Sequence, residues 1–351
     1  MNAVRYSFQP GPAQLHPEVP SAIQEALNAG ILSRYHRDEV WKSLFSQAQT
    51  ALLAHLEAPE GWLVAFVSSA TEGWHLWIQA TADLTALHIV QGAFGERWFE
   101  LRAAISPFAK KYEWDFNASP EAQVEALQSR YQGIASLALV HVETSKGAWI
   151  PDISIWRKAF PGALIGLDAA SSLGAIPIPW SEVDFVLASV QKALGLPPGL
   201  GVIFLSPRCL DTFQDYPAQA YNALSRLIQM ACQHEPIYTP NLLGIYLLAR
   251  TLPSRPPVSQ YFSAIKERAQ MLYEKVAAKG YGPILPELYQ SPTVLAFKVP
   301  SETALQELYQ KAENNGLYLG RGYGELKNQS FRIANFPAVP EEAYETLLSI
   351  L

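Results

Sequence analysis

Lys192 and Asp168 are the two residues of this sequence whose types and positions most directly suggest chemistry. Lys192 follows the apolar run 183–188 and precedes ALGLPPG, a turn that contains two prolines and two glycines. A lysine at that place is partly desolvated, which disfavours its charged form and makes the amine a better nucleophile. The alternative is an ordinary strand-end lysine whose ammonium group extends into water.

Asp168 ends the apolar segment ALIGLD and is followed by the small residues Ala-Ala-Ser-Ser. A carboxylate at the end of a buried strand is costly unless it meets a cation or several donors, although an N-cap of the next helix is an alternative. The 24 positions from Asp168 to Lys192 suffice for one helix and one strand, so we expect both side chains at the carboxyl edge of neighbouring strands. Pyridoxal phosphate requires such a pair, because a lysine bonds to its aldehyde carbon and an acid keeps its pyridine nitrogen protonated.

Short apolar runs, each followed by a small-residue turn and a helix-like segment, recur along the first part of the chain. Runs of this length are typical of fully buried strands in a largely parallel sheet. Their alternation with helices implies crossover connections, so we predict an α/β fold with ligands bound beyond the carboxyl ends of the strands. The expected strands are Trp62–Val67, Ala86–Val90, Ser136–Val142, Ala163–Leu167, Val183–Ala188 and Gly201–Leu205.

The composition changes at Thr251–Val258, where TLPSRPPV contains three prolines and marks a boundary. We predict a large domain of residues 15–250 and a small α+β domain made of residues 1–14 and 251–351. The elements expected in the last hundred residues are a helix that ends at Gly280, a strand over Pro292–Val299, a helix capped by Ser301, a strand over Ser330–Asn335 and a final helix with Pro340 in its first turn.

The composition also argues against several classes of protein. The chain is 49% apolar and 17% charged, which is enough for a sizeable core. Its net charge of −6, without a Lys/Arg run, disfavours nucleic acid as a partner. Cys209 and Cys232 are too few for a disulfide framework or a cysteine-rich zinc site, and they fit a reducing compartment. We find no secretory signal and no apolar stretch of the ~18–20 residues that a membrane helix needs. We therefore expect a cytoplasmic enzyme without a metal ion or a membrane partner.

Three segments, LDAASSLGAIPI, VQKALGLPPGLG and VHVETSKG, resemble the active-site segments of class V aminotransferases, which are pyridoxal-phosphate enzymes of fold type I. The resemblance extends from PGPAQL at Pro10–Leu15 to FRIANFP at Phe331–Pro337. It implies that Lys192 bonds covalently to the cofactor and later moves the substrate Cα proton. It also implies that Asp168 pairs with the pyridine nitrogen, and that the chain forms a homodimer with amino-acid and 2-oxo-acid substrates.

The same resemblance assigns further contacts with the cofactor. The segment SSATEG falls where the family binds the cofactor phosphate, and small residues at a helix N-terminus expose N–H groups to an anion. The family usually has more glycine in this loop, and an ordinary helix cap is the alternative. The implied contacts are Ser69, Ala70, Thr71 and Gln191 at the phosphate, Thr239 at the phosphate of the other subunit, Phe94 stacked on the pyridine ring (otherwise a core residue), and Thr144 at the phenolate oxygen.

Four basic residues are candidates for substrate binding. Arg332 in SFRIAN resembles the family arginine that binds the substrate α-carboxylate, to which a planar guanidinium is suited; a surface arginine is the alternative. His36 and Arg37 resemble a His-Arg pair of the family near the dimer interface, although a solvated helix start would look the same. Together with Arg321 they are the candidate ligands of a phosphoryl group. Glu72 in SSATEG would oppose such a charge.

PGPAQL and the His36-Arg37 segment resemble phosphoserine aminotransferases, which favours transfer from phosphoserine to 2-oxoglutarate in serine biosynthesis. The segments around Lys192 and Asp168 are closer to the alanine–glyoxylate and serine–pyruvate branch, which is the alternative. A cysteine desulfurase needs a nucleophilic Cys in its C-terminal domain, and both cysteines precede that domain. A nicotinamide dehydrogenase would carry GxGxxG after its first strand, and we find none. A catalytically idle binding protein with this fold is a further alternative, which the retention of Lys192 opposes.

Overall fold

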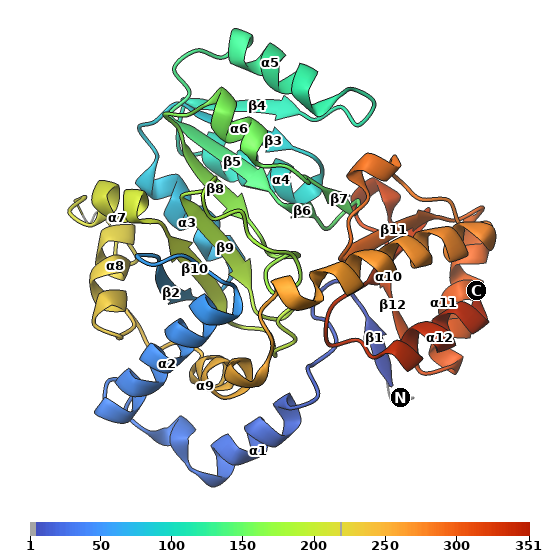
Figure 1. Ribbon diagram of the computed structural model, residues 1–351, viewed down its shortest axis with the longest axis horizontal. Helices are drawn as coiled ribbons and strands as arrows, with labels where there is room; N and C mark the ends of the chain where they lie inside the picture. Colours follow the sequence, from blue (N-terminus) through green and yellow to red (C-terminus); the bar gives the residue numbers. More distant parts are fainter. Residues whose placement is uncertain (1–4, 218–219) are drawn as a thin grey trace.

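The computed structural model describes residues 5–217 and 220–351, whose strands form two main sheets (Figure 1). The strands are β1 (Tyr6–Phe8), β2 (Leu63–Val67), β3 (Ala86–Val90), β4 (Ala109–Glu113), β5 (Ser136–Val140), β6 (Val142–Glu143), β7 (Ala148–Trp149), β8 (Leu164–Asp168), β9 (Phe185–Ser189), β10 (Gly201–Leu205), β11 (Val294–Lys298), β12 (Leu317–Arg321) and β13 (Ser330–Ala334). The α-helices are α1 (Val19–Asn28), α2 (Glu39–His55), α3 (Ala70–Ala80), α4 (Ala93–Ala103), α5 (Pro120–Arg130), α6 (Ser154–Ala159), α7 (Pro207–Phe213), α8 (Leu224–Cys232), α9 (Leu242–Thr251), α10 (Ser259–Ala278), α11 (Glu302–Asn314) and α12 (Glu341–Ile350). The short 3₁₀ helices are η1 (Ile31–Ser33), η2 (Leu252–Ser254), η3 (Glu287–Tyr289) and η4 (Gly324–Leu326).

Seven strands form the larger sheet, in the order β2-β10-β9-β8-β5-β3-β4. Every pairing from β9 to β4 is parallel, whereas β10 runs antiparallel to both β2 and β9. This mostly parallel sheet confirms the predicted α/β class. β8 and β9 are neighbours, with Asp168 opposite Leu187. The last residue of β8 therefore lies beside the strand that leads to Lys192, as the spacing of the two residues predicts.

The strands of the larger sheet carry continuous apolar runs because both faces of the sheet are buried. In β9, Val186 and Ala188 belong to one hydrophobic cluster, and Phe185 and Leu187 belong to a second. The predicted strands are present: β3 and β10 have the expected ends, and the other ends differ by at most two residues. β9 extends to Ser189, and the run expected over 136–142 is divided into β5 and β6.

The edge strand β4 does not follow this apolar pattern. Its sequence AKKYE leaves every residue exposed or half-buried, so it gives no apolar run and was not among the expected strands. Lysines on an edge strand discourage pairing with another chain. Edge position, rather than apolar burial, explains this sequence.

The smaller sheet has the order β1-β12-β13-β11. β1, drawn in blue in Figure 1, pairs in parallel with β12 among the orange and red elements near the C-terminus. The N-terminal segment thus joins the last hundred residues, as expected. The division of the chain at residues 14 and 250 stays a prediction.

The ends of several C-terminal elements follow from local chemistry. The hydroxyl of Ser301 accepts a hydrogen bond from the Ala304 N–H and caps α11, which confirms its predicted role. Gly280 follows α10 with a φ of 92°, the left-handed conformation that favours glycine after a helix. Pro340 is the N-cap of α12 rather than a residue of its first turn. Over residues 5–217 and 220–351, no helix has the length and apolar character needed to span a bilayer.

Gly166 in β8 is expected to tolerate no side chain, because a Cβ atom there would lie 2.8 Å from the Trp77 ring. Gly166→Ala should therefore lower the free energy of unfolding by about 1–3 kcal/mol through overpacking. Gly162→Ala is the matched control, because nothing lies within 4 Å of the added Cβ. Its expected effect is below about 0.5 kcal/mol. Denaturant unfolding measures both, and equal stabilities would contradict this packing.

Candidate active site

The Lys192 amine lies among polar side chains beyond the ends of β8 and β9. Its Nζ donates hydrogen bonds to Ser171 Oγ at 2.9 Å and to Thr144 Oγ1 at 3.2 Å. Burial lowers the pKa of Lys192 to about 8, although the nearby Asp168 carboxylate opposes that shift. Two hydroxyl groups thus orient an amine that loses its proton more readily than an ordinary lysine does. Ser171 was not among the candidate residues.

Asp168 is only 4% exposed, and each of its carboxylate oxygens accepts one hydrogen bond. The indole N–H of Trp74 donates to Oδ2 at 2.9 Å, and the Ala170 N–H donates to Oδ1 at 2.8 Å. Burial raises the pKa of Asp168 to about 6, although the Ala170 N–H and the Lys192 charge oppose that shift. At neutral pH the carboxyl is therefore ionised in a site that does not favour a free negative charge.

The aromatic ring of Phe94 lies near the amine. Lys192 Nζ lies 5.5 Å from the centroid of the Phe94 ring. Phe94 stacks on Tyr323 with ring centroids 5.2 Å apart and an interplanar angle of 29°. Tyr323 follows β12 of the smaller sheet, and Phe94 begins α4, so this contact joins the two sheets at the site.

Arg332 in β13 is buried on the side of the small sheet that faces Thr144. Its Nε donates to the Arg321 carbonyl at 2.7 Å, and its Nη1 donates to the Thr144 carbonyl at 2.8 Å. Its Cζ lies 5.7 Å from the centroid of the Tyr323 ring. Burial lowers the pKa of Arg332 to about 10, which leaves it charged at neutral pH. Among the described residues no hydrogen bond uses the second N–H of Nη1 or either N–H of Nη2, so three N–H groups remain for a ligand.

Glu143 holds the start of α4 in place. This fully buried carboxylate accepts hydrogen bonds from the Phe94 and Gly95 N–H groups at 3.1 and 3.0 Å, and from the Ser145 hydroxyl at 2.6 Å. Gly92 leaves the space for it, since a Cβ atom there would lie 2.7 Å from Glu143 Cγ. The position of the Phe94 ring therefore depends on Glu143, which was not among the candidate residues.

The SSATEG segment lies at the start of α3, close to the end of β9. Ser69 is the N-cap of α3, and its Oγ accepts a hydrogen bond from the Glu72 N–H at 3.1 Å. The Ala70 N–H donates to Ser189 Oγ at 3.1 Å, so β9 and α3 meet here. Gln191 adds a buried Oε1 that has no hydrogen-bond partner in the described residues. Thr71 is half-buried in the first turn of α3.

The Glu72 carboxylate is satisfied by neutral donors. It accepts hydrogen bonds from the Ser68 N–H at 2.7 Å, from the Tyr238 hydroxyl at 2.7 Å and from Asn222 at 3.3 Å. Burial alone would raise the pKa of Glu72, but these donors outweigh it and hold the pKa below its usual value. Glu72 therefore stays ionised, and its bond to Tyr238 places the segment that contains Thr239 beside the start of α3.

The remaining candidates do not reach Lys192 within one chain. Arg37 Nη2 donates to the Pro236 carbonyl at 3.3 Å, so the His36-Arg37 pair lies near the segment of Thr239. The Arg321 guanidinium lies over the Tyr309 ring, 5.5 Å from its centroid, and only the Arg321 carbonyl contacts Arg332. In the part of the chain that the structure describes, no hydrogen bond joins these four side chains to Lys192.

Metal chemistry has no ready ligand set in this site. Over the described residues, no group of three or more His, Cys, Asp or Glu side chains is arranged to hold a metal ion. The site offers an activated amine, a buried carboxylate, a planar aromatic ring and a buried guanidinium.

The lowered pKa of Lys192 predicts how the chemical modification of its amine depends on pH. The rate constant for modification of Lys192 by isocyanic acid, the reactive form of cyanate, should rise about tenfold per pH unit in the cofactor-free chain and level off above pH 8, because the neutral amine reacts and the rate is divided by the isocyanic acid concentration at each pH. In the denatured chain the same residue should level off only above about pH 10.4. Peptide mass spectrometry measures both rates. Coincident profiles would contradict the burial of this amine.

Comparison with known proteins identifies the family of this chain. Residues 5–280 match the model of the family described as Aminotransferase class-V. The chain belongs to this family. Class V aminotransferases are pyridoxal-phosphate-dependent transaminases, so the predicted family, enzyme class and cofactor are confirmed.

The class V aminotransferase is similar over its whole length to a solved phosphoserine aminotransferase from Cytophaga hutchinsonii. The two are 28% identical, with 100% of this chain and 99% of that chain covered and a TM-score of 0.91, which confirms the fold. A serine–glyoxylate aminotransferase of Methylorubrum extorquens is 26% identical, covering 93% of this chain and 85% of the relative. A 2-aminoethylphosphonate–pyruvate transaminase of Aeromonas hydrophila subsp. hydrophila is also 26% identical, covering 76% of this chain and 73% of the relative. Transamination is common to these relatives, whereas the amino donor differs among them.

Proposed function

We propose that this class V aminotransferase transfers the amino group of phosphoserine to 2-oxoglutarate, with Lys192 and Asp168 as catalytic residues. One observation carries the assignment of the site. The Lys192 amine donates to the Thr144 hydroxyl, and the Arg332 guanidinium donates to the carbonyl of the same Thr144. A reactive amine and a buried, partly unpaired cation thus lie on either side of one residue, as a reaction at the Cα of an amino acid requires.

The side chains at the site have the chemistry that pyridoxal phosphate needs. The bound cofactor supplies an electron sink for the electrons that remain when the donor Cα loses its proton. Lys192 would hold the cofactor covalently and then carry that Cα proton, for which an amine with a lowered pKa is suited. Asp168 keeps free lone pairs on both oxygens, so it can hold the ring nitrogen in its protonated form.

The remaining contacts with the cofactor follow from the same placement. Phe94 offers a ring face near the Lys192 amine, and the Thr144 hydroxyl accepts a hydrogen bond from that amine. The amide nitrogen of Gln191 is a donor from which a phosphate can accept, and its Oε1 has no hydrogen-bond partner among the described residues. We assign the phosphate to Ser69, Ala70 and Thr71 at the start of α3 and to Gln191, together with Thr239 of the partner subunit.

Arg332→Ala should mainly weaken binding of the amino acid, because the guanidinium has free N–H groups for a carboxylate. We expect KM for the donor to rise about 30- to 1000-fold with a smaller change in kcat. Arg332→Lys keeps the charge but loses the planar pair of donors, so its KM should lie between those of the parent and of Arg332→Ala. Steady-state kinetics measures this. An unchanged KM in Arg332→Ala would rule out the proposed role.

We favour phosphoserine as the amino donor because several candidate cations lie away from Lys192 within one chain. Two of the relatives are named after amino donors that carry a phosphoryl or phosphonate group. His36 and Arg37 lie near the segment of Thr239 and, within the described residues, form no hydrogen bond with Lys192 of their own chain. We therefore propose a homodimer in which this face completes the partner's site, with Arg321 as a further cation for the phosphoryl group.

The donor is tested by initial rates with phosphoserine, alanine and serine, using 2-oxoglutarate, pyruvate and glyoxylate as acceptors. With phosphoserine and 2-oxoglutarate, kcat/KM should exceed that for alanine by at least about 100-fold, because unpaired cations disfavour the shorter donor. Arg37→Gln should reduce this ratio and leave the alanine rate within about twofold. A faster reaction of alanine or serine with glyoxylate or pyruvate would replace the proposal with the alternative branch, which the serine–glyoxylate relative favours.

A further inference from the structure

We propose that Arg255, together with Glu18, acts as a positioning residue for Lys192 by holding the backbone of the loop that carries it. The proposal rests on the proposed role of Lys192 and adds a part of the chain to which the chemistry assigns no function. Arg255 lies in the turn before α10, more than sixty positions from the loop, and Glu18 lies immediately before α1.

Arg255 contacts the loop directly through its guanidinium. Its side chain is only 6% exposed, and Nη1 donates to the Leu194 carbonyl at 2.7 Å. Nε donates to Glu18 Oε1 at 2.7 Å, and Nη2 donates to Thr251 Oγ1 at 3.2 Å. Each nitrogen of the guanidinium therefore has a partner, and one partner is the carbonyl two residues after Lys192. A lysine cannot reproduce this planar set of three donors.

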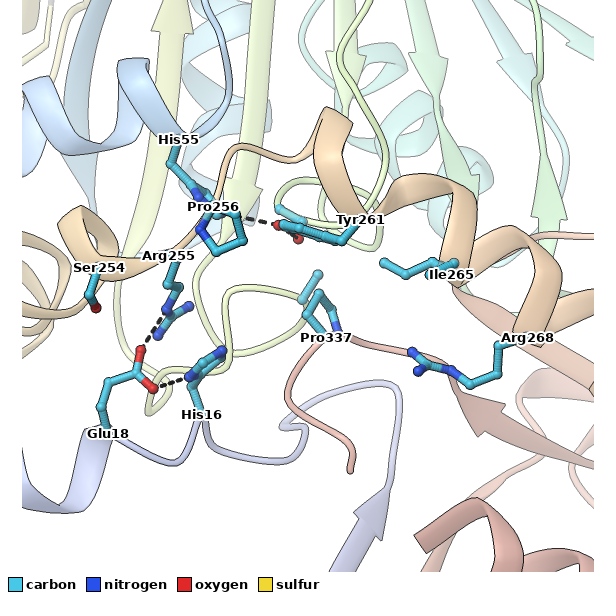
Figure 2. A pocket seen from close by; sticks show the side chains of 13 residues that line it. His16, Glu18, His55, Ser254, Arg255, Pro256, Tyr261, Ile265, Arg268 and Pro337 are labelled. Atoms are coloured by element: carbon cyan, nitrogen blue, oxygen red, sulfur yellow. Dashed lines mark hydrogen bonds and ion pairs between the residues drawn. The ribbon is translucent and has the colours of Figure 1, made fainter. Parts of the chain in front are cut away.

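Glu18 gives the buried guanidinium its counter-charge and extends the contact. Its second carboxylate oxygen bonds to His16 Nδ1, and Figure 2 shows Arg255 and His16 both directed toward this carboxylate. A buried arginine without a counter-charge is strongly disfavoured. The position of Arg255 therefore depends on the N-terminal segment.

The same N-terminal segment contacts the loop through its backbone. The Ala13 N–H donates to the Gln191 carbonyl, and the His16 N–H donates to the Gly195 carbonyl, both at 2.9 Å. The carbonyls of Gln191, Leu194 and Gly195 are thus all bonded from outside the loop. The backbone on both sides of Lys192 is therefore fixed by residues far away in the sequence.

Gly11 brings the segment against the Lys192 side chain itself. Its φ is 146°, and a Cβ atom there would lie 3.0 Å from Lys192 Cε and 3.2 Å from Cγ. The stem of the lysine therefore packs on bare backbone. A small shift of the loop would move the amine relative to Ser171 and Thr144, and displacements of about 1 Å are known to cost about 100-fold in rate.

A cavity of about 430 Å³ lies beside this contact and offers a way to test it. Figure 2 shows it between His16 and Arg255 on one side and Tyr261 and Ile265 of α10 on the other. Ala193, next to Lys192, is part of its wall. Truncation of Arg255 would open its space to this cavity, so a small guanidinium compound could enter and replace the missing group.

The experiment compares Arg255→Ala, Arg255→Lys and Glu18→Gln with the parent. Arg255→Ala should lower kcat about 10- to 100-fold and change KM by less than about threefold, because the amine is displaced while the carboxylate site is intact. Arg255→Lys should be intermediate, and millimolar ethylguanidinium should restore part of the kcat of Arg255→Ala. Arg250→Ala is the matched control, because Arg250 pairs with Glu25 at the surface, where both side chains are about half exposed.

Hydrogen exchange in the cofactor-free chain gives a readout independent of the reaction. The Gly195 N–H bonds to the Lys192 carbonyl, and the Leu196 N–H bonds to the Val190 carbonyl. Both amides should exchange at least about tenfold faster in Arg255→Ala and Glu18→Gln, and at the parent rate in Arg250→Ala. An inactive parent would refute the proposed function, whereas this exchange still tests the contact.

Two results would overturn the proposal. One is a folded Arg255→Ala variant with the parent's kcat. The other is unchanged exchange at Gly195 and Leu196. If Arg255→Ala fails to fold, Glu18→Gln and Arg255→Lys are judged by the same two measurements, kcat and amide exchange. Each of these variants keeps one residue of the Arg255–Glu18 pair and replaces the other with a side chain of similar size.

Discussion

Lys192→Ala is expected to lower kcat by more than about 10⁴-fold, because one residue supplies both the covalent attachment and the proton transfer. The chain should stay folded, since the amine is held by two hydroxyl groups and not by the hydrophobic core. Lys192→Arg should be equally inactive, because a guanidinium keeps the charge but cannot replace the amine. Coupled-enzyme assays with purified protein measure both variants.

Lys146→Ala is the matched control for this substitution. Lys146 is the lysine of the VHVETSKG segment, and its amine lies over the Phe116 ring, 6.0 Å from its centroid, and not at the site. Its removal should change kcat by less than about twofold. A Lys192→Ala variant that works as fast as the Lys146→Ala control would remove the mechanism.

Asp168→Asn is expected to lower kcat about 10²- to 10⁴-fold while changing the shape of the site little. Asparagine can still accept one N–H, but it carries no charge that keeps the ring nitrogen protonated. Asp184→Asn is the control, because Asp184 is also a buried aspartate but bonds to Arg157 Nη2 at 2.7 Å and to the Ile165 N–H at 2.8 Å. It should lose stability and keep most of its kcat once folded. Equal kcat values for the two variants would contradict the role of Asp168.

The same Asp168→Asn variant should differ from the parent in the pH dependence of stability. Burial raises the pKa of Asp168 to about 6, so the folded state binds its proton more tightly than the unfolded state does. The stability that this proton provides is present below about pH 4 and is lost as the pH rises through about 6. Across that window the cofactor-free variant should gain on the order of 1–3 kcal/mol relative to the parent. Urea unfolding at several pH values measures the difference, and a constant difference would contradict the raised pKa.

Much of the site could be predicted because its residues follow strands. The carboxyl ends of parallel strands meet at one sheet edge, so the apolar runs before Asp168 and Lys192 were enough to place them together. These predictions depended on local apolar patterning, which is strong where both faces of a sheet are buried.

Residues that depend on long-range packing could not be predicted in this way. Trp74 precedes its partner Asp168 by 94 positions, and an indole in a helix is most often a core residue. Tyr323 reaches Phe94 only because the two sheets meet at the site. The only signal for Glu143 was an acid in an apolar segment, and its partners are backbone N–H groups that no side-chain motif reveals.

The most direct test of the account is to locate the covalent attachment of the cofactor. The chain is loaded with pyridoxal phosphate, reduced with borohydride, digested and mapped by mass spectrometry, with Lys192→Arg as the control. We predict the reduced cofactor on Lys192 in the parent and on no lysine in the variant. A label on another lysine, or no label on a parent that transaminates, would contradict the assignment of Lys192.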